Sequence, residues 1–578
     1  MSDIIFSFGD FEIEIPQNST FEKGKLSENF GDDLDQRINT YLNRNDSELI
    51  NSFILPVSLT GNFFDFSGLI FAHHIRLSRN LKCCDVKVAF YGTLELTELL
   101  RLSPLARILI TENVFYIDIA KHSFEEIIEL IASKSKKINF QSILNQIQIS
   151  PPSNYDGNHH SVDNEFALIQ WSIQNGSYES LPDDFKKEFD SLLYFKYLRA
   201  KNPLSHLEIK TFEKIQLETS IKILLIDDES RKGWKDFYEF FFQKLSNKID
   251  FQDIDIDFKN SNSLDRNELI STIISEIKKI DPDIILLDLR LLDIDIDNEK
   301  EPNQLTGIKI LEKIKEVNNG IQVIVTTASN KVWNFKYANQ KGALDYIIKN
   351  GFESPEVTLK KIRATIEYAS IRAIYLKPIY NKMIKSLNSW NEYKLPKRKN
   401  LNDPMHDKLW HINLKLQVND FIKNAFDTIN NDSISERFTI STLLLFRVIE
   451  MMNEFYIMEC GDYRDKTIQY FFDQDNTMVP KISKLKGQYI IDSKVQKGVQ
   501  LSTKEKTMAI YHKTNKINPT LFDGIHKLTD YRNNVTIHPK KRFKEESLEY
   551  MYESDFNRFS NSLNIYFSAI LDYVESFK

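Results

Sequence analysis

The chain has 578 residues, a formal net charge of −7 and 42% hydrophobic residues, enough for three or four domains at roughly 150 residues each. The negative balance excludes a global electrostatic basis for nucleic-acid binding, so any contact with RNA must be local. The three cysteines lack metal-binding spacing, which indicates a reducing compartment. No window approaches the roughly 18 apolar residues of a membrane span. We therefore expect a cytoplasmic, multidomain protein that does not span a membrane.

Residues 1–217 form the first expected domain, and its middle part alternates strand and helix patterns. The runs, in chain order, are 53–59 (strand), 68–77 (helix), 86–91 (strand), 94–102 (helix) and 106–110 (strand). This order predicts an α/β domain. The pair His73–His74 invites a metal or phosphorelay interpretation, but a helix-face or partly buried pair is the favoured one.

Polar side chains follow four apolar runs in residues 218–355. They are Asp227 and Asp228 after 221–226, Asp288 after 284–287, Thr327 after 321–326 and Lys349 after 345–348. Helical patterns separate the runs, which predicts a doubly wound parallel sheet. The carboxyl ends of such strands share one edge, so we expect three carboxylates, a hydroxyl and an amine in one pocket. Three close carboxylates favour a hard divalent cation, and we expect Mg²⁺.

These residues resemble the receiver domain of two-component response regulators. The resemblance implies that Asp288 is the phosphoacceptor and that a histidine kinase or phosphotransfer protein supplies the phosphoryl group. The other implied roles are metal ligation by Asp227, Asp228, Asp288 and the backbone carbonyl of Arg290, a switch hydroxyl on Thr327, a switch aromatic at Tyr346, phosphate binding by Lys349, and a helix-opening glycine at Gly307. The chain departs from the family in a long acidic loop at 291–306 and in Asn350, where a proline is usual.

The N-terminal region parallels the second half of this receiver-like pattern. A degenerate receiver-like domain is one interpretation of residues 1–217. The segment Pro56–Leu59 stands where the phosphoacceptor would fall and contains no acidic residue, so we expect no phosphorylation there.

Residues 356–400 are expected to form a long connector helix and a linker. Apolar residues fall mostly on one face, and they are Val357, Leu359, Ile362, Ile366, Ala369, Ala373 and Leu376. Such a face predicts either a dimer seam or packing on the adjacent domain. Pro378 is expected to kink or restart the helix.

Residues 401–578 are expected to be all-helical, and they carry a second motif, Arg532-Asn533 followed by His538. An arginine can stabilise charge on a scissile phosphate, and a histidine can transfer protons near neutral pH. RNA carries its own nucleophile, the 2′-hydroxyl, so this pair suffices for metal-independent cleavage. The motif resembles that of HEPN ribonucleases. The helix at 443–456, with Arg447 and Glu450, resembles the arginine–glutamate helix of CRISPR-associated HEPN ribonucleases.

Two functions follow from these patterns. The first is a phosphorylation-regulated, metal-independent ribonuclease. It would act on single-stranded RNA in defence or stress, with Arg532, Asn533 and His538 of two chains meeting in a homodimer, as the HEPN resemblance implies. The second is a non-catalytic two-component signalling adaptor whose helical domain binds a partner or RNA.

Overall fold

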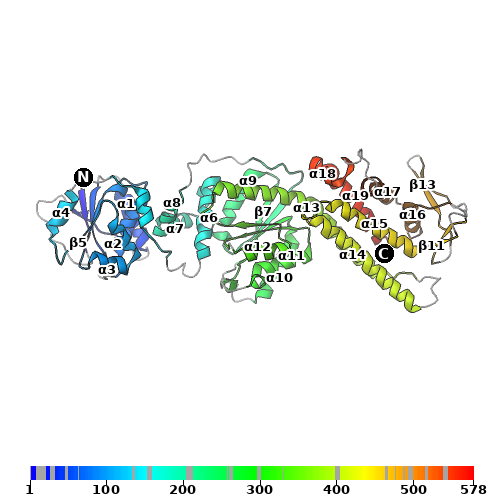
Figure 1. Cartoon of the computed structure of the whole chain (residues 1–578), viewed down its shortest axis with the longest axis horizontal. Coiled ribbons are helices and arrows are strands. Elements are labelled where there is room, and N and C mark those ends of the chain that lie inside the picture. Colours follow the sequence, from blue (N-terminus) through cyan, green and yellow to red (C-terminus); the bar gives the residue numbers. More distant parts are fainter. Residues whose placement is uncertain are drawn as a thin grey trace.

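The computed structural model shows three parts in a row along the long axis of the molecule: an N-terminal α/β domain, a central α/β domain and a C-terminal helical domain (Figure 1). The structure describes residues 2–7, 21–26, 33–45, 50–60, 62, 64–132, 137–152, 159–203, 213–256, 258, 265–295, 301–329, 331–396, 404–461, 467–474, 477–485, 488–492, 499–514, 518–537 and 545–577.

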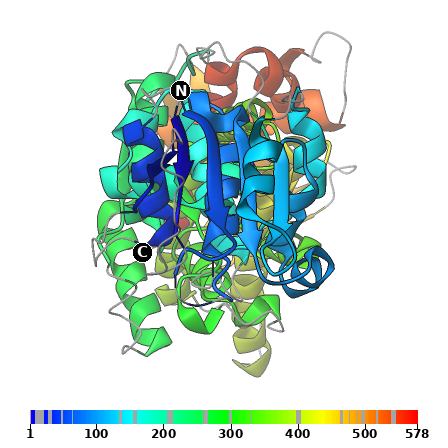
Figure 2. The ribbon, with the colours of Figure 1, turned by 90° about the vertical axis from the view of Figure 1, so that its left-hand side faces the viewer.

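The N-terminal sheet has five parallel strands in the order β2-β1-β3-β4-β5. They are β1 (Ser2–Ile5), β2 (Phe21–Lys23), β3 (Ile50–Pro56), β4 (Lys87–Gly92) and β5 (Val114–Asp118). The accompanying helices are α1 (Leu34–Asn45), α2 (Ser67–Leu77), α3 (Leu96–Leu102), α4 (Phe124–Ala132) and α5 (Phe140–Gln146). Figure 2 views this domain from the end of the molecule.

The prediction of a strand at 106–110 is wrong. Residues Pro104–Ile110 form a 3₁₀ helix, and the fifth strand follows it at Val114–Asp118. Pro104 begins the 3₁₀ turn, and the Ser103 hydroxyl accepts a hydrogen bond from the Leu105 amide. The local capping chemistry therefore outweighs the apolar pattern.

Three helices, α6 (His159–Asn175), α7 (Asp183–Ser191) and α8 (Leu193–Lys201), connect the two α/β domains. Phe166 and Trp171 of α6 are buried in the same core as Trp234 of the central domain. Helix α8 contributes Tyr197 to the N-terminal core and Leu198 to the central one. Helices α6 and α7 thus pack with the central core while α8 joins both cores, and the boundary at 217 stays a prediction.

The central sheet has the strand order β10-β9-β8-β6-β7, again all parallel. Its strands are β6 (Ile221–Ile226), β7 (Ile249–Asp253), β8 (Ile284–Leu287), β9 (Gln322–Thr327) and β10 (Asp345–Ile348). Its helices are α9 (Trp234–Leu245), α10 (Arg266–Ile280), α11 (Thr306–Val317) and α12 (Val332–Gln340). The order matches that of the N-terminal sheet and places the topological switch point between β6 and β8, where ligands of doubly wound sheets bind.

Helix α13 (Pro355–Glu392) runs from the central domain into the C-terminal one (Figure 1). The restart expected at Pro378 is not found, because Pro378 lies inside one continuous helix, and a kink there stays a prediction. Buried neighbours such as Leu376 and Ile379 hold the helix on both sides of the proline, so tertiary packing offsets the lost backbone hydrogen bond. All the apolar residues of the predicted face except the exposed Val357 are buried within this chain. Of the two predictions for this apolar face, packing on the adjacent domain accounts for it.

The C-terminal domain is mainly helical. Its helices are α14 (Pro404–Asn430), α15 (Arg437–Tyr456), α16 (Thr503–Thr514), α17 (Pro519–Tyr531), a π-helix (Arg532–Ile537), α18 (Leu548–Ser554) and α19 (Phe556–Glu575). The expectation of an all-helical domain is wrong, because two antiparallel strand pairs lie between α15 and α16. They are β11 (Ile457–Cys460) with β12 (Gln469–Phe472), and β13 (Lys481–Leu485) with β14 (Gln488–Asp492).

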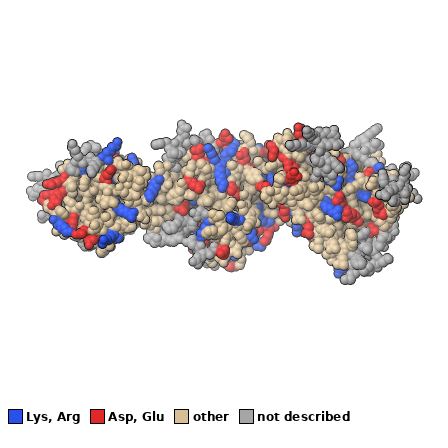
Figure 3. Space-filling model, viewed as in Figure 1, with Lys and Arg blue, Asp and Glu red and all other residues tan. Residues whose placement is uncertain are grey.

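Within the described residues, no helix combines the length and the apolar character that crossing a membrane requires. Lysine and arginine side chains are interspersed with acidic ones on the face that Figure 3 shows. This mixture agrees with the small net charge.

Candidate functional site

Three carboxylates meet at the switch point of the central sheet. Asp227 and Asp228 follow β6, Asp288 follows β8, and one oxygen atom from each lies within 4.8 Å of the others. Burial and neighbouring negative charge raise the pKa values of Asp227 and Asp228. Such a set of oxygen donors fits a hard divalent cation, whose charge would compensate the buried carboxylates.

Lys349 joins these carboxylates from the end of β10. Its Nζ donates to Oδ2 of Asp227 and, at 3.3 Å, to Oδ2 of Asp288. Burial would lower the pKa of this fully buried lysine, but attraction to Asp227 and Asp288 raises it. The ammonium group also lies 4.6 Å from the centre of the Trp234 ring. The site therefore keeps a fixed positive charge beside Asp288.

Thr327 and Tyr346 lie on neighbouring strands at the same edge. The Thr327 hydroxyl accepts a 3.4 Å hydrogen bond from the Ser329 amide, and the Tyr346 hydroxyl donates to the Ser329 carbonyl at 2.8 Å. Tyr346 is buried and packs edge-on against Phe335. The aromatic side chain thus points inward, tied to the segment that follows Thr327.

Gly307 allows helix α11 to approach the loop after Asp288. A Cβ at Gly307 would lie 2.2 Å from the Asp288 carbonyl oxygen, and the Gly307 amide donates to the Leu289 carbonyl at 3.1 Å. The Arg290 amide donates to Oδ1 of Asp288 at 3.1 Å, which orients the carboxylate. The role of the Arg290 carbonyl as a metal ligand stays a prediction.

Asp295 is a residue whose role the sequence did not reveal. It is fully buried and forms an ion pair with Arg266 of α10 at 2.8 Å. Its two oxygens also accept hydrogen bonds from the amides of Leu291, Leu292 and Thr306. Through these contacts, the Asp295 carboxylate connects both ends of the acidic loop to α10. Its spacing from the other acids carries no signal of this role.

The N-terminal domain has the same backbone contacts as the central site but lacks its reactive side chains. A Cβ at Gly68 would lie 1.8 Å from the Pro56 carbonyl oxygen, and the Gly68 amide donates to the Val57 carbonyl at 3.0 Å. These are the contacts that Gly307 makes with Asp288 and Leu289. Pro56 therefore stands at the position of Asp288.

The other two site positions can be matched in the same way. The Ile119 amide donates to the Gly92 carbonyl at 2.9 Å, as the Lys349 amide donates to the Thr327 carbonyl at 2.8 Å. Gly92 and Ile119 thus replace the hydroxyl and the amine. Without a carboxylate, hydroxyl or amine at these positions, the N-terminal site lacks the groups for phosphoryl transfer.

His73 and His74 are buried in α2 of this domain. Their Nε2 atoms lie 3.0 Å from the Leu105 carbonyl and 2.9 Å from the Asp35 carboxylate, respectively. Within the described residues, neither belongs to a cluster that could hold a metal ion. The histidines were expected on a helix face or partly buried, and burial is in fact complete.

The two C-terminal motifs lie together in space. Arg532 begins the π-helix, its guanidinium lies 4.7 Å from the centre of the Phe446 ring, and Nη2 lies 3.9 Å from Glu450 of α15. Arg532 also donates to the Asn533 side chain at 2.9 Å. Arg447 pairs with Glu450 at 3.1 Å on the partly exposed helix surface. His538 lies outside the described residues.

The family model described as "Inactive Receiver domain" matches residues 3–117. The match falls at the N-terminus, and not in the central domain where sequence analysis placed the receiver. It agrees with Pro56 at the phosphoacceptor position and confirms the receiver-like interpretation of this domain. A receiver-like domain links the chain to two-component signalling and to a kinase or phosphotransfer partner in general.

Several solved structures are similar to parts of this chain. A signal receiver domain of a putative Luxo repressor protein from Vibrio parahaemolyticus is 20% identical, with a TM-score of 0.19, over 27% of this chain and 92% of its own. NtrX from Brucella abortus is 14% identical, with a TM-score of 0.19, over 35% of this chain and 34% of its own. A putative two-component system response regulator/GGDEF domain protein is 8% identical, with a TM-score of 0.18, over 64% of this chain and 99% of its own. TM-scores this low fix neither the domain arrangement nor the function. No curated protein matches the chain.

Proposed function

We propose that the chain is a response regulator whose central domain takes a phosphoryl group on Asp288 and thereby controls its C-terminal domain. The observation that carries this proposal is the meeting of Asp227, Asp228 and Asp288 with the buried amine of Lys349. The donor would be a phosphohistidine of a kinase or phosphotransfer protein. The N-terminal domain, with Pro56 at the equivalent position, would not compete for the phosphoryl group.

The residues of the site support this transfer chemically. An oxygen of the Asp288 carboxylate forms the new O–P bond, the P–N bond of the donor breaks, and the freed imidazole nitrogen keeps the electron pair. Lys349 would hold one phosphoryl oxygen, and the Thr327 hydroxyl would donate to another. Mg²⁺ held by Asp227, Asp228, Asp288 and the Arg290 carbonyl would supply charge neutralisation at the phosphoryl oxygens.

A chain of polar contacts supports communication with the C-terminal domain. Strand β9 ends at Thr327 and begins at Gln322, whose side chain accepts a 3.0 Å hydrogen bond from Arg372 of α13. The buried Arg372 also donates to the Asn430 carbonyl at 2.8 Å and contacts Asp432. One side chain therefore ties the strand carrying the switch hydroxyl to the turn between α14 and α15.

The output we propose is metal-independent cleavage of single-stranded RNA. Arg532 is partly exposed and lies beside Glu450 and Phe446, so the two sequence motifs form one surface. The Arg532 side chain is 29% exposed, and a guanidinium can bind a phosphate oxygen through its nitrogen atoms. Arg532 would stabilise the scissile phosphate, Asn533 would orient it, and His538 would transfer protons. Two such sets would meet in a homodimer, in a defence or stress response.

Phosphorylation and cleavage can be tested together. We expect acetyl phosphate with Mg²⁺ to phosphorylate the full chain and the Asp288→Asn variant to remain unmodified. Asp293→Asn, an exposed position in the same loop, is the matched control. Labelled single-stranded RNA, incubated with and without beryllofluoride, then tests the output. Phosphorylation of Asp288 without RNA cleavage in any state would favour the adaptor function, and labelling of Asp288→Asn would reject the phosphoacceptor.

A further inference from the structure

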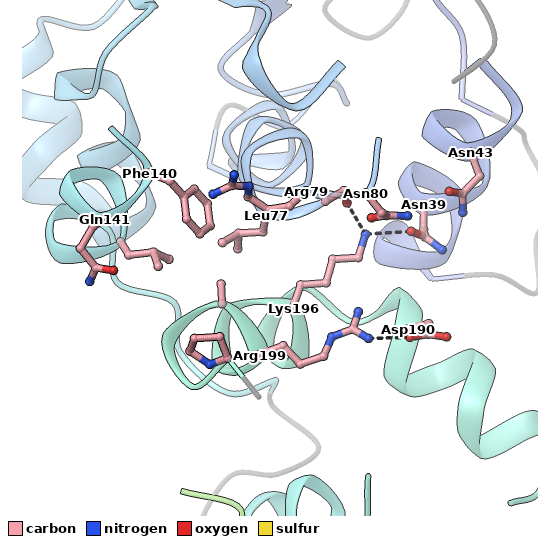
Figure 4. Close-up of a pocket in the computed structure, with 14 residues that line it drawn as sticks. Asn39, Asn43, Leu77, Arg79, Asn80, Phe140, Gln141, Asp190, Lys196 and Arg199 are labelled. Carbon is pink, nitrogen blue, oxygen red and sulfur yellow. Dashed lines mark hydrogen bonds and ion pairs between the residues drawn. The ribbon is translucent and has the colours of Figure 1, made fainter. Parts of the chain in front are cut away.

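A cavity of about 670 Å³ lies where the N-terminal domain meets helices α7 and α8 (Figure 4). Its lining comes from α1, the end of α2, α5, α7 and α8, with residues Asn39, Asn43, Arg79, Phe140, Lys196 and Arg199 among those that face it. Its volume is far larger than a bare phosphate ion requires and falls in the range of small-molecule sites.

Positive charge dominates the lining. The charged residues are Arg79, Lys196, Arg199 and one acid, Asp190, which forms a 3.0 Å ion pair with Arg199. Arg79 and Lys196 make no ion pair with any carboxylate of the described residues. Two cations thus face the cavity without a directly bonded anion.

Lys196 is held in place by neutral hydrogen-bond partners, and the nearby carboxylates of Asp35 and Asp190 only partly offset the cost of burying its charge. It is 5% exposed, and its Nζ donates to the Asn39 side chain and the Ser78 hydroxyl, both at 2.8 Å. Both partners are neutral, and burial lowers the pKa of Lys196 to about 8. An anion bound in the cavity would favour the charged amine, which has a third hydrogen to donate.

The opposite wall supplies a flat surface and hydrogen-bonding groups. The Arg79 guanidinium stacks over the Phe140 ring at 4.2 Å from its centre, an arrangement that fixes the guanidinium and leaves its edge free to bind phosphate oxygens. Side-chain amides of Asn43, Asn80 and Gln141 complete the rim. These amides suit the hydroxyls and ring edges of a nucleoside.

We propose that this cavity binds a small phosphate-bearing molecule of nucleotide size, with the phosphate held between Arg79 and Lys196. The ligand would touch α8, the helix that contributes to both the N-terminal and the central cores. The N-terminal domain, which has Pro56 in place of a phosphoacceptor, would thus receive a chemical signal by binding. The proposal does not depend on phosphorylation of Asp288.

Calorimetric titration of the full chain with ATP and with inorganic pyrophosphate tests this site. EDTA in the buffer suppresses cation-dependent binding at Asp227 and its neighbours. We expect both probes to bind and Arg79→Ala and Lys196→Gln to weaken each at least tenfold. Lys201→Ala, an exposed lysine on the same helix outside the lining, should bind like the unmodified chain. Tighter binding of ATP than of pyrophosphate would show that the nucleoside is also recognised, and equal affinities would show recognition of phosphate alone.

Two results would overturn the proposal. One is the absence of binding of either probe to the unmodified chain. The other is an unchanged affinity in Arg79→Ala, whose exposed side chain can be removed without opening the core. Circular dichroism of Lys196→Gln shows whether that variant is folded, and Arg79→Ala decides the outcome if it is not.

Discussion

Arg266 of α10 and the fully buried Asp295 form an ion pair whose Nη2–Oδ1 distance is 2.8 Å. Asp295 also accepts hydrogen bonds from backbone amides at both ends of the loop that follows Asp288. Removing one partner of a buried pair costs about 3–5 kcal/mol, and the partly exposed side chain of Arg266 places the loss at the lower end of this range. Asp295 is therefore the residue on which the order of the long acidic loop depends.

We expect Asp295→Ala to destabilise the central domain by about 3 kcal/mol and to slow phosphorylation of Asp288. Urea unfolding and the rate of labelling by acetyl phosphate measure the two effects. Asp293→Ala, an exposed neighbour in the loop, is the control and should change neither quantity. Equal stability of the two variants would show that the ion pair does not order the loop.

Substitutions of Asp228 and of Lys349 should affect cation binding differently. Asp228→Ala removes a ligand and should weaken Mg²⁺ binding. Lys349→Ala removes a positive charge from beside Asp227 and Asp288, so Mg²⁺ should bind at least as tightly while phosphorylation is lost. Trp234 lies against the Lys349 amine, and its fluorescence can follow the titration, with Trp234→Phe identifying its signal. Weaker Mg²⁺ binding in Lys349→Ala would contradict the assigned roles.

The buried histidine His73 should make the N-terminal domain sensitive to acid. Burial lowers the pKa of His73 from 6.5 to about 4, so the unfolded chain binds a proton between these values and the folded chain does not. The contribution of neutral His73 to the free energy of unfolding is therefore intact above pH 6.5, and it falls by up to about 3 kcal/mol as the pH drops towards 4. Thermal melting at pH 7.5 and 5.0 should show the loss.

The double variant His73→Gln, His74→Gln provides the comparison. It should be less stable at pH 7.5, because hydrogen bonds to Leu105 and Asp35 are altered, but its stability should depend less on pH. A pH dependence equal to that of the unmodified chain would place the acid sensitivity elsewhere.

Arg372 should carry the signal from the central to the C-terminal domain. Arg372→Ala removes the contacts with Gln322, Asn430 and Asp432. We expect beryllofluoride still to bind the central domain but no longer to change hydrogen exchange in α15. Lys360→Ala, on the exposed face of the same helix, should preserve the response. A full response in Arg372→Ala would show that the signal takes another route.

The placement of the polar residues of the central site at one sheet edge could be predicted from the sequence, because β6, β8, β9 and β10 are mainly apolar runs, each ended or followed by a polar residue. Asp288 and Lys349 are 61 residues apart, yet a parallel sheet brings every strand end to one edge. The sequence did not reveal the role of Asp295, because a buried aspartate looks like its exposed neighbours. The contacts of Arg372 with residues 58 and 60 positions away depend on packing between domains, which no local pattern encodes. The strand pairs at 457–492 were not predicted, because polar or charged residues such as Glu459, Lys484 and Asp492 interrupt or end their short apolar runs.

Arg532 and His538 should decide whether the C-terminal domain cleaves RNA. Losing one positioned acid–base group typically costs about 10²–10⁴ in rate, so His538→Ala should nearly abolish cleavage. Arg532→Lys keeps the charge but loses the planar fork, so it should retain little activity. Arg447→Lys is the control on the neighbouring helix surface. Products should carry 2′,3′-cyclic phosphate ends, and cleavage by beryllofluoride-free protein should resist EDTA, since the 2′-hydroxyl attacks without a metal.

The homodimer provides a separate test of the same output. Mixing Arg532→Ala with His538→Ala protein should restore part of the activity if the two chains contribute different groups to one site. Light scattering at the assay concentration should then show dimers. Full activity of a monomeric protein would reject the hypothesis that two chains form one catalytic site. Full activity of an Arg532→Ala, His538→Ala double variant would reject the assignment of these residues as catalytic. It would favour a C-terminal domain that binds a partner, because no other proton-transfer group has been assigned to this surface.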